Sequence, residues 1–98
     1  MPDIKIERTQ SETEGRYSVR VAGIEEEGEL TYVRRGADLV IAHHTFAPPS
    51  MRGTGAALKL VERLVADARA EGFKIKPTCS YIVAQAKRHP EWADVMVG

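Results

Sequence analysis

A glycine-rich turn in the middle of the chain has the composition of a phosphate-binding site. It consists of Arg52, Gly53, Thr54, Gly55, Ala56 and Ala57 and directly precedes a run with helical spacing. The first amides of a helix have no partner inside the helix, and the helix dipole adds to their attraction for anions. Glycines let the backbone come close to such a ligand, and Arg52 can add a charge-assisted contact. The turn therefore predicts a diphosphate site, although an ordinary turn before a core helix gives the same pattern.

Cys79 is the only cysteine and a candidate for nucleophilic chemistry. It follows Pro77 and Thr78 and is expected at or near the first position of a helix, where the thiolate form is favoured. A thiolate there could form a transient acyl-enzyme, and a thiol could return a proton to a leaving group. A small buried hydrophobic residue is the alternative interpretation. One cysteine allows no internal disulfide, which suits a reducing compartment.

Two neighbouring histidines could supply a base. His44 lies on the strand that leads to the glycine-rich turn and could act as a base or orient a water. Because side chains alternate along a strand, His43 is expected on the opposite face, where packing is its expected role. His89 precedes Pro90 and is typical of a helix end. A histidine satisfied by backbone contacts remains the alternative for His44.

The first third of the chain alternates between apolar and polar residues, as strands with one wet face do. Strands are expected over Tyr17–Val21 and Glu29–Arg34, after an earlier extended segment that ends in a polar turn at Thr9–Gly15. Gly23–Gly28 is an acidic turn, and its three consecutive glutamates are expected to be solvated. Short loops between such segments predict antiparallel neighbours.

A central strand and a long helix follow. Leu39–Ala42 is apolar at consecutive positions, which predicts a strand covered on both faces that continues to Phe46 and stops before Pro48 and Pro49. The helix is predicted up to Gly72 from apolar residues at helical spacing, namely Ala57, Leu60, Val61, Leu64, Val65 and Ala68.

The chain ends with a short strand and a second helix. The strand is expected over Phe73–Lys76, and Thr78 is a plausible N-cap for a helix from Cys79 to about Arg88. Together the elements predict an α/β fold with a mixed, mostly antiparallel sheet, a long helix after the central strand and a second helix near the C-terminus. A strand, helix and strand in sequence predict one crossover connection. No repeat or linker interrupts the 98 residues, so residues 1–98 are expected to form one domain.

Charge and hydropathy exclude several classes of partner. Lys plus Arg and Asp plus Glu both number 14, which gives a net charge of zero and no bulk attraction to nucleic acid or anionic membranes. No apolar stretch approaches the roughly 20 residues that cross a bilayer, and the N-terminus lacks the apolar region of a signal peptide. A soluble, cytoplasmic protein without a metal site is expected.

Taken together, the motifs of the chain resemble the GNAT (GCN5-related N-acetyltransferase) family, and in particular its very small stand-alone members. The likeness runs from about Glu29 to Asp94. The residues that carry it are His44-Thr45, Pro49, Arg52-Gly53-x-Gly55-x-Ala57, Pro77-x-Cys79-Ser80-Tyr81 and His89-Pro90-Glu91.

The resemblance implies a compact GNAT-like domain that binds acetyl-CoA. It implies that the backbone of Thr45, Phe46 and Ala47 pairs with pantetheine, and that the amides of the glycine-rich turn hold the pyrophosphate. The thioester is then expected between the strand ending at Ala47 and the strand ending at Lys76. Lys87 is expected to reach the 3′-phosphate, and a solvated helix end is the alternative.

One position departs from the resemblance. Relatives often carry an acidic residue directly after the His-Thr pair, but here the residue is Phe46, and Glu29 could substitute for the missing carboxylate. Three hypotheses follow. The chain is an acetyl-CoA-dependent N-acetyltransferase with Cys79 and His44 as catalytic residues and an unidentified amine or protein as acceptor; or it binds CoA or acyl-CoA with little turnover; or it is a protein-interaction domain. A monomer or weak homodimer is expected.

Overall fold

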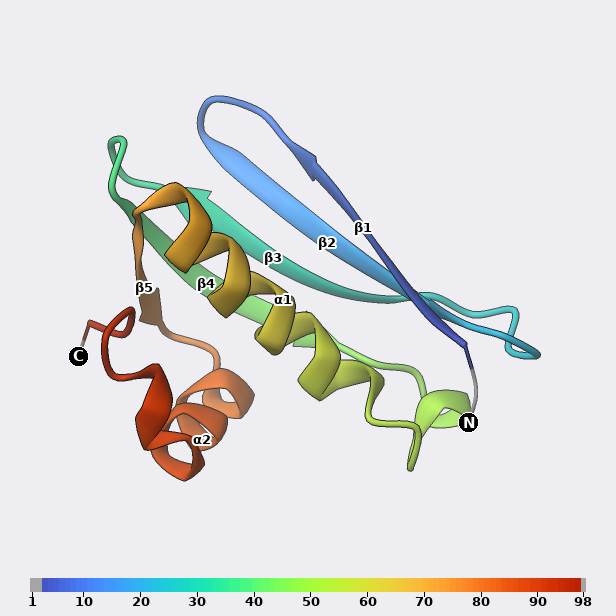
Figure 1. Ribbon diagram of the computed structural model, residues 1–98. Helices are drawn as coiled ribbons and strands as arrows, with labels where there is room; N and C mark the ends of the chain where they lie inside the picture. The colour runs from blue at the N-terminus through green and yellow to red at the C-terminus, as the bar shows by residue number, and fades with distance from the viewer. Residues whose placement is uncertain (1–2, 98) are drawn as a thin grey trace.

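The structure, a computed structural model, describes residues 3–97 and contains one five-stranded sheet and two α-helices (Figure 1). The prediction of an α/β fold with a mixed sheet is confirmed. The elements in chain order are β1 Ile4–Gln10, β2 Glu14–Val21, β3 Gly28–Arg34, β4 Leu39–Phe46, the 3₁₀ turn η1 Pro49–Met51, α1 Ala56–Glu71, β5 Lys74–Pro77, α2 Ser80–Arg88 and the 3₁₀ turn η2 Pro90–Trp92.

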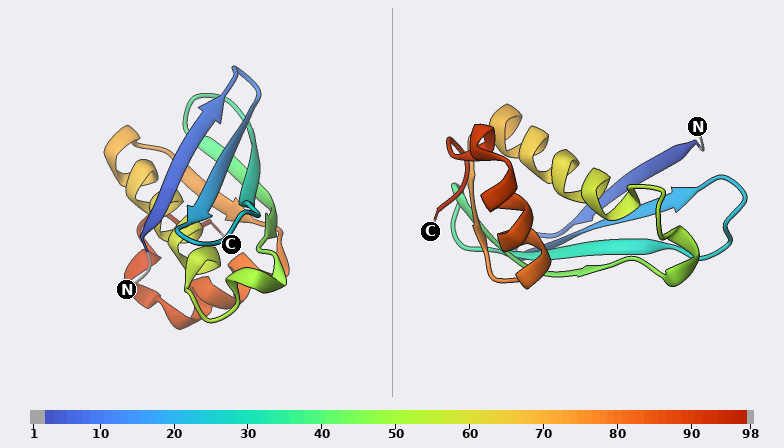
Figure 2. Two further views of the ribbon diagram at one scale, coloured as in Figure 1. Left: turned by 90° about the vertical axis from the view of Figure 1, so that its right-hand side faces the viewer. Right: turned by 90° about the horizontal axis from the view of Figure 1, so that it is seen from below.

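The strands lie in the sheet in the order in which they occur in the chain. β1 to β4 are antiparallel neighbours joined by short turns, and β5 pairs with β4 in parallel after the crossover through α1. α1 lies along one face of the sheet, whereas no helix of residues 3–97 covers the opposite face of β1 to β3 (Figure 2). The chain therefore presents a long polar sheet surface on the side away from α1.

The core lies between α1 and the inward face of the sheet. The apolar stripe of α1 is buried, namely Ala56, Leu60, Val61, Leu64, Val65 and Ala68. It packs against inward residues of β2 and β3, of which Tyr17, Val19, Leu30 and Tyr32 are fully buried. Burying an aliphatic side chain of this size stabilises the fold by about 1.5–3 kcal/mol, so this contact fixes where α1 lies on the sheet.

The C-terminal segment closes the β5 edge of the sheet. The Ile75 N–H donates to the Val95 carbonyl at 2.7 Å, and the Val97 N–H donates to the Ile75 carbonyl at 2.8 Å. Trp92 is buried and its ring stacks on the His89 ring at a centroid distance of 4.1 Å. His89 is the C-cap of α2, as its position before proline predicted.

A β-bulge in β4 changes the expected placement of the two histidines. Thr31 pairs with His44, but its neighbour Tyr32 pairs with Ala42, so His43 is an extra residue in the ladder. Both histidines are exposed on the face away from α1, and the prediction that they point to opposite faces is wrong. Val40 and Ala42 are buried whereas the residues alternating with them are partly exposed, so this strand is fully covered on one face and not on both.

The start of α2 differs from the prediction by one residue. Cys79, not Thr78, is the N-cap, with extended backbone dihedrals and no side-chain capping bond. Thr78 is held by β4 instead, since its N–H donates to the Ala42 carbonyl at 2.9 Å. The tertiary contact with β4 therefore competes with the local capping preference of threonine. Neither helix in residues 3–97 has the length and hydrophobicity needed to cross a membrane.

Candidate functional site

The N-terminus of α1 is built from glycines in left-handed conformations. Gly53 has φ +84° and Gly55, the N-cap of α1, has φ +79°. A residue with a Cβ is strained by about 1–2 kcal/mol in this region. A Cβ built on either glycine meets no other atom within 4 Å. The space beside both glycines is therefore open to a ligand.

Backbone donors at this turn are left without partners. Among residues 3–97, the N–H groups of Gly53, Gly55, Ala57 and Leu58 form no hydrogen bond. The Ala56 N–H is the exception, since it donates to the Thr54 hydroxyl at 3.2 Å. Unpaired amides at the positive end of a 16-residue helix are the kind of group to which anions bind in proteins.

Residues of the glycine-rich turn and of the end of β4 line one open hollow of about 460 Å³. Most of the residues expected at the site line it, namely Thr45, Ala47, Arg52, Gly53, Gly55, Ala56 and Ala57. Thr54 does not line the hollow, and its hydroxyl donates to the Met51 carbonyl at 2.6 Å. The Arg52 side chain forms no ion pair within residues 3–97 and is exposed, so its charge is available to an anion.

Two predicted residues lie elsewhere. Phe46 does not line the hollow, and its side chain is 49% exposed. Lys87 lies on α2 and lines a different hollow, of about 430 Å³, together with Lys76, Pro77 and the C-terminal segment. The structure therefore does not bring the Lys87 side chain to the glycine-rich turn.

Strands β4 and β5 separate next to the hollow. They pair only from Leu39 to Ala42 on β4, and the N–H groups of Thr78 and Cys79 both donate to the Ala42 carbonyl, at 2.9 and 3.3 Å. Beyond Ala42, no strand of the described residues pairs with this side of β4. The backbone of residues 43–46 is therefore available on that side to an extended ligand.

Cys79 lies where the two strands separate. It is half-buried at the N-terminus of α2. Burial acts to raise the pKa of its thiol. Hydrogen bonding to the Ile82 N–H, the Thr45 hydroxyl and the Tyr81 N–H acts in the opposite direction and outweighs burial, so the pKa of Cys79 lies below the ordinary thiol value. The position therefore favours a reactive sulfur.

The Thr45 hydroxyl is the polar group that links Cys79 to the hollow. Its oxygen is buried and has no hydrogen-bond partner of ordinary geometry within residues 3–97. It is one of the groups that lower the pKa of the Cys79 thiol. Thr45 is therefore a lining residue of the hollow whose buried hydroxyl is unsatisfied within the described residues.

His44 and Glu29 form a pair on the exposed face of the sheet. The His44 Nε2 lies 3.1 Å from a Glu29 carboxylate oxygen, and Arg16 Nε donates to the other oxygen at 2.8 Å. The hydrogen bond from Arg16 is the main cause that lowers the pKa of Glu29. Glu29 is thus held ionised and is a weak base. Within residues 3–97, no hydrogen bond joins His44 to Cys79.

Tyr81 is a site residue to which the sequence analysis gave no role. It lines the hollow from α2, opposite the glycine-rich turn, and burial raises the pKa of its hydroxyl. Tyr81 follows Cys79 by two residues at the start of the predicted helix, and this nearness could have indicated that it lies at the same site. Met51, Leu58 and the proline pair also line the hollow. Leu58 belongs to the predicted helix α1, whereas Met51 lies in the turn η1, which the sequence did not predict.

Comparison with known proteins identifies the family. A family model described as GCN5-related N-acetyl-transferase matches residues 16–95, which is most of the chain, and the protein belongs to this family. Membership makes the fold an N-acetyltransferase domain and implies acetyl-CoA as the acyl donor.

A solved structure agrees in fold. The solution NMR structure of a GCN5-like protein from Staphylococcus aureus is similar to this chain with a TM-score of 0.62 and 24% sequence identity. The match covers 94% of this chain and 88% of the other. No match is found among curated proteins.

Proposed function

We propose that this protein is an acetyl-CoA-dependent N-acetyltransferase in which residues 1–98 form a single acyl-CoA-binding domain. The observation that carries the proposal is the set of unpaired amides at Gly53, Gly55, Ala57 and Leu58, which open onto the same hollow as Thr45. The pyrophosphate of CoA carries the charge and the acceptor oxygens that these donors and Arg52 require.

We assign the pantetheine and thioester parts of acetyl-CoA to the free edge of β4. The free side of β4 at Thr45, Phe46 and Ala47 pairs with the amides of pantetheine, which is the hydrogen bonding that an open strand edge offers. This direction leads from the glycine-rich turn toward the point where β4 and β5 separate, so the thioester lies near Cys79. Lys87 reaches the 3′-phosphate only if its long side chain turns away from the hollow that it lines.

Acetyl transfer to an amine removes one proton from the amine and leaves the CoA sulfur with an electron pair. Cys79 has two routes to contribute. As a thiolate it attacks the thioester carbonyl, releases the CoA thiolate and passes the acetyl group on to the amine; as a thiol it gives its proton to the departing CoA sulfur. His44, oriented by Glu29, takes the amine proton. Glu29 itself is unsuited to that role because its pKa is lowered.

Radiolabelled acetyl-CoA separates the two routes and tests the proposal. With an amine panel that includes lysine peptides and polyamines, labelled product is expected, and Cys79→Ala is expected to lose most of the rate. The nucleophilic route predicts an acetyl adduct on Cys79 in the absence of an acceptor, detected by mass spectrometry. Saturation with CoA but no labelled product with any amine contradicts the proposal.

Binding of CoA with little turnover is the second candidate. It is favoured by Phe46, an exposed apolar residue two positions after His44 on β4, where a carboxylate could otherwise assist. A thermal unfolding titration with CoA distinguishes both candidates from a protein-interaction domain. A ligand at a hundredfold excess over its Kd raises the free energy of unfolding by about 2.7 kcal/mol, and an unchanged melting temperature contradicts both.

The pH dependence of Cys79 reactivity gives an independent check. Because the pKa of the folded thiol is lowered, its thiolate form is populated at lower pH than in an unfolded cysteine. The rate of alkylation by iodoacetamide is expected to reach half its plateau below the pH found for the same protein in denaturant. The variant Thr45→Val is expected to move that midpoint upward. A midpoint equal to that of the denatured protein contradicts the assignment.

The chemistry of Cys79 also suggests where the protein works. A free thiol at Cys79 is kept reduced in the cytoplasm, which is the proposed location. The acceptor is an amine, either a small molecule or a protein side chain. Residues 3–97 contain no group of three or more His, Cys, Asp or Glu side chains placed to hold a metal ion. All the roles above are assigned to protein groups.

A further inference from the structure

The outer edge of β1 is an unpaired strand edge. Among residues 3–97, β1 is the first strand of the sheet and pairs only with β2, whereas the opposite edge at β5 is covered by the segment around Met96. The Ala22 N–H donates to the Asp3 carbonyl at 2.9 Å, which fixes the direction of the β1 peptide groups. In an antiparallel strand the direction alternates, so the N–H and C=O groups of Ile4, Ile6 and Arg8 point outward from the sheet.

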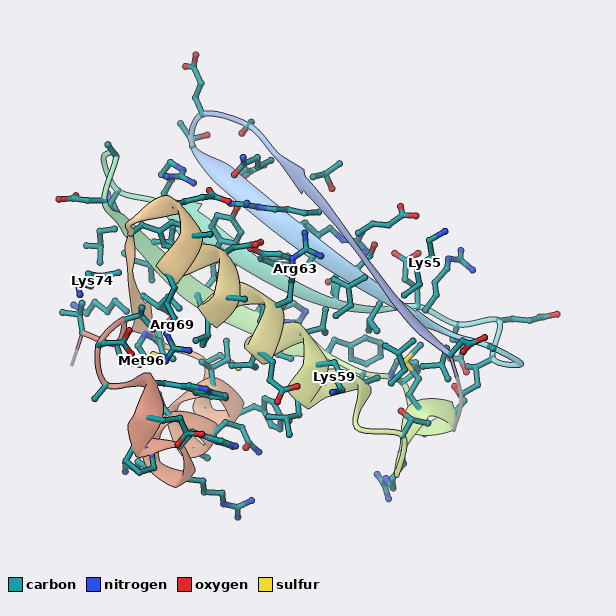
Figure 3. All side chains as sticks on the ribbon, viewed as in Figure 1. Lys5, Lys59, Arg63, Arg69, Lys74 and Met96 are labelled. Carbon is teal, nitrogen blue, oxygen red and sulfur yellow. The ribbon has the colours of Figure 1, made fainter. Side chains whose placement is uncertain are left out.

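The side chains along this edge form a short alternating pattern. Lys5 and Glu7 are exposed on the face away from α1, as Figure 3 shows for Lys5, and neither forms an ion pair within residues 3–97. Ile4 and Ile6 are on the α1 side, only partly buried against the core. The edge therefore combines open backbone groups, two unpaired opposite charges and two partly exposed apolar side chains.

We infer that β1 pairs with β1 of a second copy of this chain in antiparallel orientation, with Ile6 opposite Ile6 of the second copy. The two Ile6 residues then exchange backbone hydrogen bonds, and Ile4 and Arg8 do so with their counterparts. Lys5 lies directly opposite Glu7 of the second copy, and the symmetry makes this contact twice. The inference goes beyond the proposed function because the edge contains none of the residues assigned to the acetyl-CoA site.

Charge selects this register over its neighbours. Only residues whose peptide groups point outward can form the hydrogen-bonded pairs. One β1 strand can therefore slide along the other only in steps of two residues. One step in one direction places Lys5 opposite Lys5, and one step in the other places Glu7 opposite Glu7. Like charges directly opposite each other destabilise a strand pair, whereas opposite charges stabilise it. The pairing centred on Ile6 avoids both repulsions.

The same pairing buries apolar surface. The side chains of Ile6 from the two copies meet on the α1 side, and Ile4 meets the aliphatic part of Arg8. Arg8 stays available for this contact because its guanidinium turns away toward Glu71. A single strand pair is small compared with stable interfaces, so the dimer is expected to form reversibly in the micromolar to millimolar range.

The test is sedimentation velocity over a concentration series of the full chain. Lys5→Glu and Glu7→Lys are each expected to raise the dimer dissociation constant by at least about tenfold, because each places like charges opposite one another twice. The double variant with both changes restores the opposite pairs and is expected to return to within a few-fold of the original protein. Arg35→Glu, an exposed charge reversal in the turn between β3 and β4, is the matched control and is expected to have no effect.

A second measurement reports on the strand itself. Amide exchange of the Ile6 N–H, which points outward, is expected to slow as the protein concentration rises, while Lys5, whose N–H points to β2, stays protected throughout. A chain that stays monomeric into the millimolar range overturns the inference. So does a dimer that the single charge reversals leave unchanged, or one that the double variant fails to restore.

Discussion

The two ends of α1 differ in how their polar groups are satisfied. At the N-terminus, Gly55 provides no side-chain cap, and four nearby backbone N–H groups are unpaired among the described residues. At the C-terminus, Gly72 closes the helix with a hydrogen bond from its N–H to the Ala68 carbonyl at 2.9 Å. Side chains of the last two turns are tied to the sheet as well. One end of the helix is open to a ligand, and the other is fixed.

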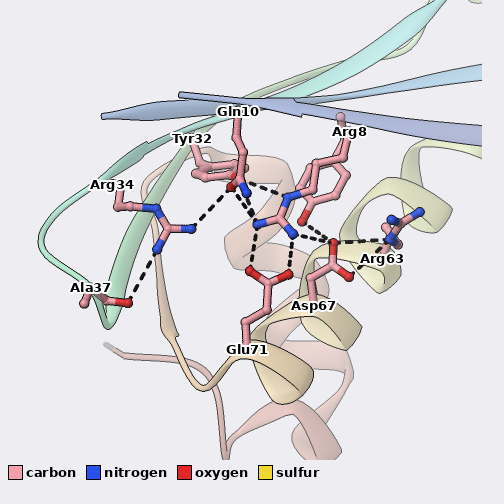
Figure 4. A network of polar contacts seen from close by, with 9 residues as sticks. Arg8, Gln10, Tyr32, Arg34, Ala37, Arg63, Asp67 and Glu71 are labelled. Carbon is pink, nitrogen blue, oxygen red and sulfur yellow. Dashed lines mark hydrogen bonds and ion pairs between the residues drawn. The ribbon is translucent and has the colours of Figure 1, made fainter. Parts of the chain in front are cut away.

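The fixed end depends on a network of charges between α1 and the sheet (Figure 4). Arg8 binds the Glu71 carboxylate and lies 3.4 Å from a carboxylate oxygen of Asp67, which also accepts a 2.7 Å hydrogen bond from the Tyr17 hydroxyl. The bond to Glu71 is the main cause that raises the pKa of Arg8. The network therefore adds polar contacts with the sheet at the C-terminal end of α1, where the apolar stripe already packs, whereas the N-terminal end presents unpaired amides.

The largest expected effect is on the fixed end. Arg8→Met removes the cation from two carboxylates and the Tyr32 hydroxyl, and is expected to lower the free energy of unfolding by about 3 kcal/mol. For a domain of this size that corresponds to roughly 12–24 °C in melting temperature. Thermal unfolding measures the loss, and Arg35→Met is the exposed control. A change below about 1 kcal/mol contradicts the role given to the network.

The second prediction concerns the open end. Gly55→Val introduces a β-branched side chain at positive φ and places it in the open space beside Gly55, where we propose that the pyrophosphate binds. CoA affinity measured by calorimetry is expected to fall about a hundredfold. Gly72→Val is the matched control, because Gly72 has φ +81° and equally open surroundings at the fixed end. Equal losses of affinity in the two variants contradict a ligand site at Gly55.

A smaller effect is expected for the charge at the open end. Arg52→Gln removes an exposed cation without a partner in residues 3–97, so stability is expected to be unchanged while CoA binds about tenfold more weakly. The affinity difference between the two proteins is expected to shrink as salt rises, because the contact is solvent-accessible. A constant difference across the salt series contradicts a direct contact with phosphate.

The smallest effect tests one bond of the fixed end. Tyr17→Phe deletes the hydroxyl that donates to Asp67 and leaves the buried ring in place, which is expected to cost about 1 kcal/mol of stability. CoA affinity is expected to stay unchanged. Chemical denaturation resolves this difference, and a loss of CoA affinity in Tyr17→Phe contradicts the separation between the two ends.

Local sequence patterns predicted most helices and strands and the glycine-rich turn before α1, because the evidence for each lies within a short segment. The apolar stripe from Leu60 to Ala68 specified α1, and Gly53 and Gly55 marked its open end before the helix began. The network at the fixed end was not predictable in this way. Arg8 and Glu71 are 63 residues apart, and nothing near Arg8 indicates which carboxylate it meets.

The placement of side chains around Cys79 also depended on long-range structure. Cys79 was found from its type and its place after Pro77. Thr45, which helps to lower the pKa of Cys79, comes from the other side of the crossover, and the two segments become neighbours only through the parallel pairing of β4 with β5. The acidic turn was expected to be solvated, but Glu27 pairs with Arg16 at 2.7 Å, and cross-strand contacts of this kind need the register of β2 and β3.

The bulge at His43 has a consequence for insertions and deletions in β4. Because His43 is the extra residue, the inward side chains on its two sides, Ala42 and Thr45, keep the phase of a regular strand that lacks it. Deleting His43 would keep Thr45 on the inward face, whereas adding a residue between His44 and Thr45 would turn Thr45 outward. β4 can therefore lose a residue at the bulge without changing which face Thr45 lies on. Sequence alignments of relatives should place any gap in this strand at His43.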